Sequence, residues 1–210
     1  MKNKYKSAVA IIGWFGLVLQ LYLMLATVNE KSAVQKIINY FSYFTILTNI
    51  IVAFSLTVSL LSPSSKMGNF FSSPYTESAI TVYIIIVGII HFFLLRNLAD
   101  LKSWNMVADT ILHKIIPMLY AFYWVKFVTK DKLHWKDSMQ WLLYPVIYLF
   151  YVLVRGFIDC FYPYPFADVG KLGYSKALMN GILIIASFWI LGLVLIFINN
   201  LMIKKSSQKL

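Results

Sequence analysis

Six apolar runs, each about long enough to cross the hydrocarbon core of a bilayer, dominate this sequence of 210 residues. Short polar segments separate them, and no stretch between them resembles a soluble second domain. Since 60% of the residues are hydrophobic and only 13% are charged, a soluble domain of this size could not bury the apolar surface. The sequence therefore predicts an all-α, polytopic membrane protein, with a single transmembrane domain over residues 1–210. The predicted spans of this six-helix bundle are residues 7–28, 37–61, 78–95, 107–128, 139–157 and 177–198.

The formal net charge of +11 comes mainly from lysines in the polar segments. That distribution favours contact with anionic lipid headgroups over a nucleic-acid interface. Lys and Arg are more numerous on the side that holds both termini, so we expect a cell-membrane protein with cytoplasmic termini. The expected partners are membrane lipids, no nucleic acid is expected, and the sequence does not determine an oligomeric state.

The fourth predicted span contains His113, with Asp109 one helical turn before it. Ionisable side chains are costly at bilayer depth and usually face a bundle interior or a wet cavity, where they are often functional. At about 100° per residue, Asp109, His113 and Tyr120 share one face of this helix. Asp109 is therefore placed to orient the imidazole ring of His113 or to raise its basicity.

The second predicted span has a polar face, formed by Asn39, Ser42, Thr45 and Asn49 within about 120°. A single hydroxyl in such a helix often bonds its own i−4 carbonyl, but four polar groups require a polar helix or a cavity opposite them. Thr45 and His113 both lie roughly 10 Å into their spans. Their equal depth permits a hydroxyl–imidazole pair.

The fifth predicted span has a third polar face, formed by Tyr144, Tyr148, Tyr151 and Arg155 at helical spacing. Tyr148 and Tyr151 lie too far inside for interface anchors alone, which favours a cavity-lining role. Arg155 precedes Asp159 by one helical turn, so the two could form a local ion pair. Arg155 could equally bind a carboxylate or a phosphate headgroup, and both interpretations stay open.

Cofactors and metal ions are not expected. The three histidines lie on separate segments, and the single Cys160 excludes a thiolate cluster and an intrachain disulfide. The sequence contains no P-loop, dinucleotide-binding or nucleophile-elbow motif. His91, near the outer end of the third span, is expected to be an interface residue or a bundle hydrogen bond rather than a catalytic group.

Three motifs, taken in order, resemble one protein family. They are Asn39-Tyr40-Phe41-Ser42-Tyr43-Phe44-Thr45, Leu112-His113 followed by Pro117, and Tyr162-Pro163-Tyr164-Pro165-Phe166. Together they resemble the androgen-induced gene 1/androgen-dependent TFPI-regulating protein family over residues 40–168, and the chain looks like a bacterial relative. Characterised animal members are membrane hydrolases of fatty acid esters of hydroxy fatty acids that depend on an intramembrane threonine and histidine. The resemblance implies Thr45 and His113 in these roles, with Thr48 as the rival nucleophile and a lipid or fatty-acyl ester as substrate.

These residues predict a hydrolase in which His113 removes the proton of the Thr45 hydroxyl and acts again when water attacks the acyl-enzyme. Asn49 or a tyrosine of the fifth span is the expected oxyanion donor. Two other functions fit the same polar faces. One is a small transporter or carrier of a lipid or amphipathic molecule, and the other is a non-catalytic membrane scaffold.

Overall fold

The computed structural model describes residues 1–96 and 101–207, which contain helices and no strand. The chain divides into two compact units, Met1–Thr129 and Lys130–Leu210, and each is described by itself. Among the described residues, five helices are long and apolar enough to span a membrane: Lys2–Ala26, Phe44–Leu61, Pro74–Leu95, Trp135–Asp159 and Val169–Lys204. The protein is therefore all-α, with several candidate membrane-spanning helices.

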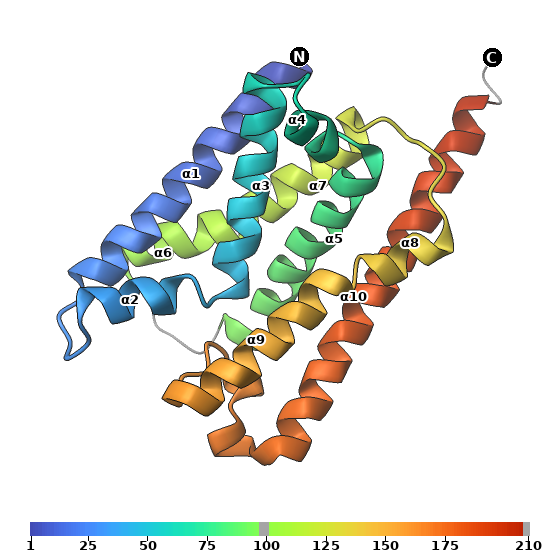
Figure 1. Cartoon of the computed structure of the whole chain (residues 1–210). Coiled ribbons are helices and arrows are strands. Elements are labelled where there is room, and N and C mark those ends of the chain that lie inside the picture. Colours follow the sequence, from blue (N-terminus) through green and yellow to red (C-terminus); the bar gives the residue numbers. More distant parts are fainter. Residues whose placement is uncertain (97–100, 208–210) are drawn as a thin grey trace. The chain divides into compact units, whose positions relative to one another are not determined.

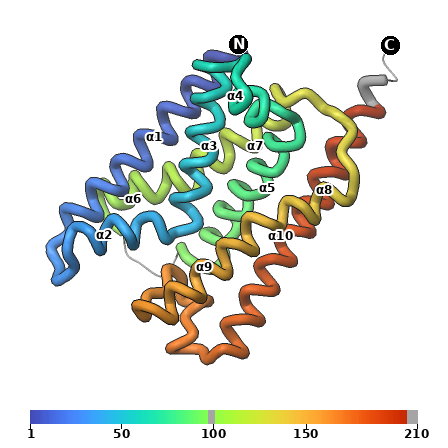
Figure 2. Tube along the Cα trace, in the orientation of Figure 1, coloured from blue at the N-terminus to red at the C-terminus, as the bar shows by residue number. Residues whose placement is uncertain are grey.

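The first unit contains seven α-helices and two π-helical segments in its described part (Figure 1). Their bounds are α1 Lys2–Ala26, α2 Ala33–Tyr40, α3 Phe44–Leu61, α4 Lys66–Phe71, α5 Pro74–Ile90, η1 His91–Leu95, α6 Ser103–Thr110, η2 Ile111–Ile115 and α7 Ile116–Phe127. α1 packs against α3 and α7, and α5 packs against α3 and α7 (Figure 2). The candidate site takes its residues from α3, α6, η1 and η2 of this unit.

Serine side chains begin three of these helices. Ser32 caps α2 and forms a capping box with Gln35. Ser65 caps α4, and Ser73 caps α5, where Pro74 occupies the first helical turn. Such caps satisfy N–H groups that lack an intrahelical partner, and proline fits at the start because its missing N–H is not needed there. The polar segments thus fix where the apolar helices start.

A glycine allows α1 to approach the segment that contains His113. A Cβ atom on Gly16 would lie 2.6 Å from Ile111 Cγ2 and 3.1 Å from Leu112 Cδ2. The adjacent core cluster contains Leu17, Tyr40, Ile46, Ala53 and Leu112. The Tyr40 hydroxyl donates to the Leu17 carbonyl oxygen at 2.7 Å, so the cluster also satisfies its buried polar group. Close packing at Gly16 therefore fixes η2 against α1.

Gly16→Val is expected to destabilise the first unit by about 1–3 kcal/mol, because the added methyl groups overlap Ile111 and force η2 away from α1. Thermal unfolding in detergent micelles measures the effect as a lower midpoint. Ala8→Val, at an exposed position of the same helix, is the matched control and should leave the midpoint unchanged. Equal midpoints for the two variants would contradict the close contact.

The second and fourth predicted spans are not continuous α-helices. Residues 41–43 separate α2 from α3, so Ser42 lies outside the helix that carries Thr45. The predicted common helical face is therefore wrong for Asn39, which lies in α2, and for Ser42, whose hydroxyl donates to the Ile38 carbonyl oxygen at 2.7 Å. The fourth predicted span is helical over α6, η2 and α7. It is not among the five candidate spans above, and the charged Asp109 and Lys114 lower its hydropathy.

The second unit contains four described elements. They are α8 Trp135–Gln140, α9 Leu143–Asp159, the short η3 Pro165–Ala167 and α10 Val169–Ser207. α10 packs against α8, α9 and η3. Gly173 adopts φ 75° and interrupts the regular geometry of α10 near its start, a conformation that favours glycine. Further along, a Cβ on Gly181 would lie 2.9 Å from Leu149 Cδ2, so glycine permits close packing of α10 on α9.

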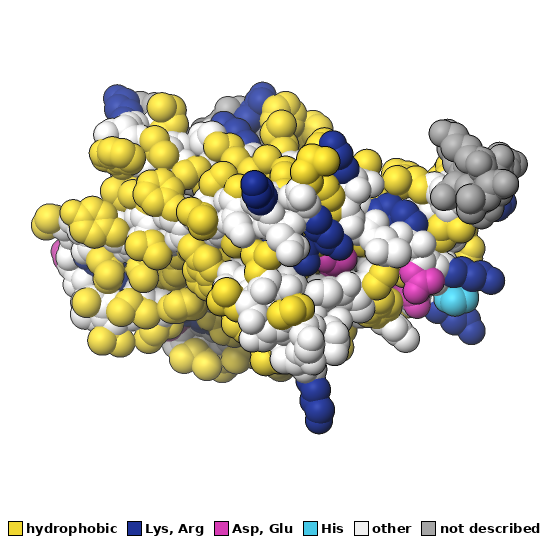
Figure 3. Space-filling view, turned by 90° about the horizontal axis from the view of Figure 1, so that it is seen from above, with side chains coloured by type: hydrophobic (Ala, Val, Ile, Leu, Met, Phe, Trp, Pro, Cys, Tyr) yellow, Lys and Arg dark blue, Asp and Glu magenta, His cyan; other side chains and the backbone are white. Residues whose placement is uncertain are grey.

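Large apolar side chains remain exposed on the helices. Phe157 is 78% exposed, Ile182 65% and Leu183 61%. Figure 3 shows apolar side chains over much of the face in view, with lysines and arginines among them. Water would disfavour apolar surface of this extent, whereas a lipid environment accommodates it. The surface thus agrees with the apolar helices in indicating a membrane protein.

Candidate functional site

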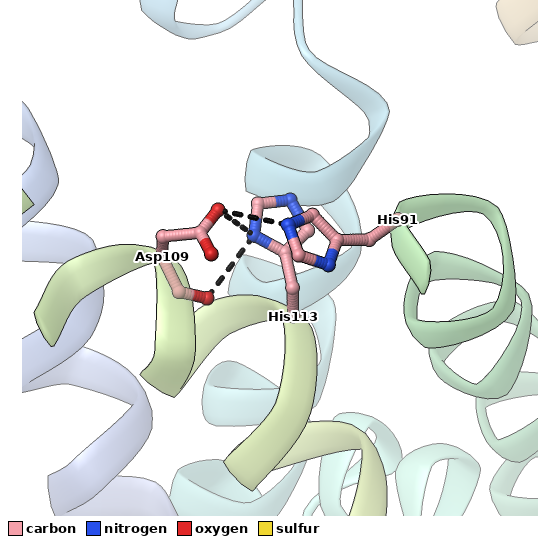
Figure 4. Close-up of side chains that lie close together, drawn as sticks. All are labelled: His91, Asp109 and His113. Carbon is pink, nitrogen blue, oxygen red and sulfur yellow. Dashed lines mark hydrogen bonds and ion pairs between the residues drawn. The ribbon is translucent and has the colours of Figure 1, made fainter. Parts of the chain in front are cut away.

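Two π-helical segments contain the histidines of the first unit. His91 is the first residue of η1, and His113 is the central residue of η2. A π turn inserts an extra residue into the α-helical repeat, and such insertions are frequent at functional sites. The two segments place the imidazole rings face to face (Figure 4). The site is therefore built where both helices depart from regular α geometry.

Each ring nitrogen of His113 has a polar neighbour. Nε2 lies 3.2 Å from Thr45 Oγ1. Nδ1 lies 2.9 Å from Asp109 Oδ1 and 3.1 Å from the Asp109 backbone carbonyl oxygen (Figure 4). Because a carbonyl oxygen only accepts hydrogen bonds, we assign the proton to Nδ1, which leaves Nε2 to accept from the Thr45 hydroxyl. Carboxylate, imidazole and hydroxyl thus follow the order found in enzymes with an activated hydroxyl nucleophile.

Thr45 is the hydroxyl that the structure places at His113. It lies in the first turn of α3, an 18-residue helix whose N-terminal end favours nearby negative charge. Thr48, the predicted rival, is fully buried within the same helix, whereas Thr45 is 6% exposed. The contact with Nε2 therefore favours Thr45 as the candidate nucleophile.

Asn49 fastens the two segments that carry Thr45 and His113. Its Nδ2 donates to the Thr45 carbonyl oxygen at 2.8 Å and to the Leu112 carbonyl oxygen at 3.2 Å. An amide nitrogen has two protons, so both are engaged by these carbonyls. The expectation that Asn49 donates to an oxyanion does not fit this arrangement. Asn49 instead holds α3 against η2 and thereby sets the spacing of Thr45 and His113.

His91 completes the cluster from α5 and η1. Its Nε2 lies 3.1 Å from Asp109 Oδ1, the same oxygen that Nδ1 of His113 contacts. The two imidazole rings stack with their centroids 4.2 Å apart and their planes 19° apart (Figure 4). His91 is buried, whereas the side chains of Asp109 and His113 are 15% and 17% exposed. Asp109 and His113 are thus the partly exposed members of the cluster, and His91 is its buried member.

His91, Asp109 and His113 also form the one group in the described part of the chain that has the residue types and spacing of a metal site, with ligand atoms within 4.8 Å of one another. A metal ion lies near the plane of each imidazole that binds it, so two rings must direct their lone pairs to one point. Stacked rings with centroids 4.2 Å apart and planes 19° apart instead keep their lone pairs in two separate, nearly parallel planes. Metal binding would therefore require one ring to turn, whereas the present geometry suits two N–H donors on Asp109.

Tyr120 belongs to a second buried cluster. Its ring centroid lies 5.5 Å from that of Tyr123, and the Tyr123 hydroxyl donates to Glu77 Oε1 at 2.6 Å. Lys6 Nζ donates to Ser59 Oγ at 2.9 Å in the same cluster, 5.7 Å from the centre of the Tyr123 ring. The predicted face shared by Tyr120 and the histidine is altered because η2 shifts the helical register by about 100° between them.

The predicted residues of the fifth span lie in the second unit. Arg155 donates through Nε and Nη2 to Asp159 Oδ2 at 3.2 and 3.1 Å, so the ion pair, one of the two predicted interpretations, is present. Tyr151 and Tyr148 have ring centroids 6.2 Å apart, on the same helix as Tyr144. A role for these residues in lining a site with Thr45 stays a prediction.

The bundle hydrogen bond, one of the two roles expected for His91, is present, because its Nε2 contacts Asp109. Sequence reasoning did not place this hydrogen bond at the candidate site. A signal in the sequence is the position of the two histidines: His91 lies near the C-terminal end of the third predicted span, and His113 lies near the N-terminal end of the fourth. In the structure, Gly88, one turn before His91, permits the close approach, because a Cβ there would lie 3.3 Å from the His113 carbonyl oxygen. Two histidines near the adjoining ends of consecutive predicted spans, with a glycine one turn from the first, favour direct contact between the two imidazole rings.

No family model matches the chain, and no curated protein or solved structure shows significant similarity to it. The geometry of the site and the sequence motifs are therefore the basis for a functional assignment.

Proposed function

We propose that the protein is an intramembrane hydrolase of lipid esters with Thr45 as nucleophile and His113 as general base. The observation that carries the proposal is the 3.2 Å contact of Thr45 Oγ1 with His113 Nε2, with Asp109 at 2.9 Å from the other ring nitrogen. A threonine hydroxyl is a weak nucleophile until a base removes its proton. The arrangement supplies the base and the carboxylate that stabilises its cationic form.

The reaction proceeds in two acyl transfers. Nε2 of His113 accepts the proton of Thr45 Oγ1 as that oxygen attacks the ester carbonyl carbon, and the imidazolium then protonates the departing alcohol oxygen. Water next gives a proton to Nε2 and attacks the acyl-threonine carbonyl, which releases the fatty acid and restores the Thr45 hydroxyl. Asp109 stabilises the imidazolium in both steps, and the N-terminal end of α3 favours the negative charge that forms beside Thr45.

The substrate class we propose is a fatty acid ester of a hydroxy fatty acid. The apolar surroundings of the site suit acyl chains, and the motifs at Thr45 and His113 resemble those of a family with this activity. In this arrangement residues 103–127 form a sixth membrane span, and both termini face the cytoplasm. The excess of Lys and Arg on the side of the termini supports that orientation.

The test measures release of fatty acid from a branched lipid ester by the purified protein in detergent. Thr45→Ala and His113→Ala are each expected to lower the rate by at least about 10³-fold, because each removes a group that acts as a unit with the other. Thr45→Ser should retain activity, since serine keeps the hydroxyl.

Thr48→Ala is the matched control, as it removes a hydroxyl one turn away on the same helix. It should retain most of the activity. Turnover that persists in both Thr45→Ala and His113→Ala contradicts the proposal. If Thr48→Ala loses activity while Thr45→Ala remains active, Thr48 rather than Thr45 is the nucleophile.

The second candidate function is transport of a lipid or amphipathic molecule, favoured by the buried ionisable groups Glu77 and Lys6 within the same unit. Ionisable groups inside apolar bundles often mark ion or substrate pathways. Flux into liposomes without ester cleavage would support transport. If the protein shows neither flux nor ester cleavage, the polar clusters serve only to pack the helices of a scaffold.

A further inference from the structure

His91 shares its hydrogen-bond acceptor with the candidate base. Its Nε2 and Nδ1 of His113 approach the same oxygen, Asp109 Oδ1, at 3.1 and 2.9 Å. The Asp109 side chain is partly exposed, and its carboxylate is free to rotate about two single bonds unless something restrains it. A second N–H donor on Oδ1 supplies that restraint. Groups that orient a reactive histidine are commonly oriented in turn by a further hydrogen bond.

The stacked ring of His91 acts on the face of His113. With centroids 4.2 Å apart, the His91 ring covers one face of the imidazole that becomes positively charged during the reaction. A neutral aromatic ring in this position is favourable for a cation and keeps that face dry. A charged ring there would repel it, so His91 has to be neutral while it donates from Nε2 to Asp109.

We propose that His91 is a positioning residue, which fixes the Asp109 carboxylate against His113 and covers one face of its ring. The inference rests on the proposed hydrolase function for its kinetic consequence, but the arrangement itself is measurable without substrate. In this proposal His91 does not contact the ester. It influences the reacting atoms only through its contacts with Asp109 and His113.

The kinetic test compares His91→Phe with His91→Gln. Phenylalanine keeps a stacked ring and removes the donor, whereas the glutamine amide nitrogen reaches the position of Nε2 and keeps the donor. His91→Phe is expected to lower kcat about 10- to 100-fold with little change in KM, as expected when a positioning hydrogen bond is lost. His91→Gln should recover to within about threefold of the wild-type kcat, because the donor matters more than the ring. His134→Phe, an exposed histidine of the second unit, is the control for the substitution itself.

The structural test uses ¹⁵N-imidazole spectra, which report the tautomer of each of the three histidines in the chain. His113 should be a single Nδ1–H tautomer in the wild type and in His91→Gln. A mixture is expected in His91→Phe, where the carboxylate turns away and leaves only the weaker carbonyl acceptor. An unchanged single tautomer in His91→Phe overturns the proposal, as does an unchanged kcat. If the wild type cleaves no ester, the hydrolase proposal fails, and the spectra still decide the role of His91.

Discussion

Asp109→Asn is expected to lower kcat for ester hydrolysis by about 10³–10⁴-fold with little change in KM. In the wild type, Nδ1 of His113 donates to the Asp109 carboxylate, which leaves Nε2 free to accept the Thr45 proton. An asparagine amide can donate its own N–H to Nδ1, which favours the tautomer with a proton on Nε2. That tautomer cannot act as a base toward Thr45, so the nucleophile is not activated.

The measurement is a comparison of kcat and KM for purified Asp109→Asn and wild type in the same detergent. Asp131→Asn, at an exposed position of the second unit, controls for the loss of one negative charge and should keep full activity. Thermal unfolding establishes that both variants are folded. A reduction of less than about 10-fold in Asp109→Asn is inconsistent with a carboxylate that sets the tautomer of His113.

The helical architecture could be predicted from the sequence because apolar runs of membrane length must satisfy their backbone hydrogen bonds internally. A pairing of Thr45 with His113 was expected from their similar distances into the predicted spans, although the turn at residues 41–43 interrupts the helix along which the distance of Thr45 was counted. Predicting their contact would also require knowing the direction in which each side chain points. That direction depends on the packing of α3 against η2, where Asn49 bonds to both segments.

The interruptions of the helices could not be predicted in this way. The π segments η1 and η2 and the turn at residues 41–43 alter the register on which the face assignments depended. No proline or glycine lies within residues 41–43 or within either π segment, although Pro117 follows η2 by two residues. The expected faces therefore do not hold for Ser42 and Tyr120, and the contact of His91 with Asp109 does not follow from the sequence alone. Each local interruption changes which residues share a helical face, and a single sequence gives little direct indication of where such interruptions fall.

Glu77→Ala is expected to destabilise the first unit by about 3 kcal/mol, as typically follows when one partner of a buried charged network is removed. Glu77 is 3% exposed and accepts the Tyr123 hydroxyl proton at 2.6 Å. The buried Lys6 lies within its electrostatic influence. Alanine would leave the Tyr123 hydroxyl without its acceptor and the lysine without its counter-charge. Unfolding in detergent should therefore show a lower midpoint.

Glu30→Ala removes the same charge at an exposed position between α1 and α2 and should leave the midpoint of unfolding unchanged. The comparison also separates the two buried clusters, because the Glu77 cluster and the histidine cluster share no hydrogen-bonded residue in the interactions described above. Distant sites without shared partners usually act independently. The remaining folded Glu77→Ala protein should therefore hydrolyse ester at close to the wild-type rate per molecule. If it is stable but inactive, Glu77 contributes to function rather than to folding, and the transport interpretation gains.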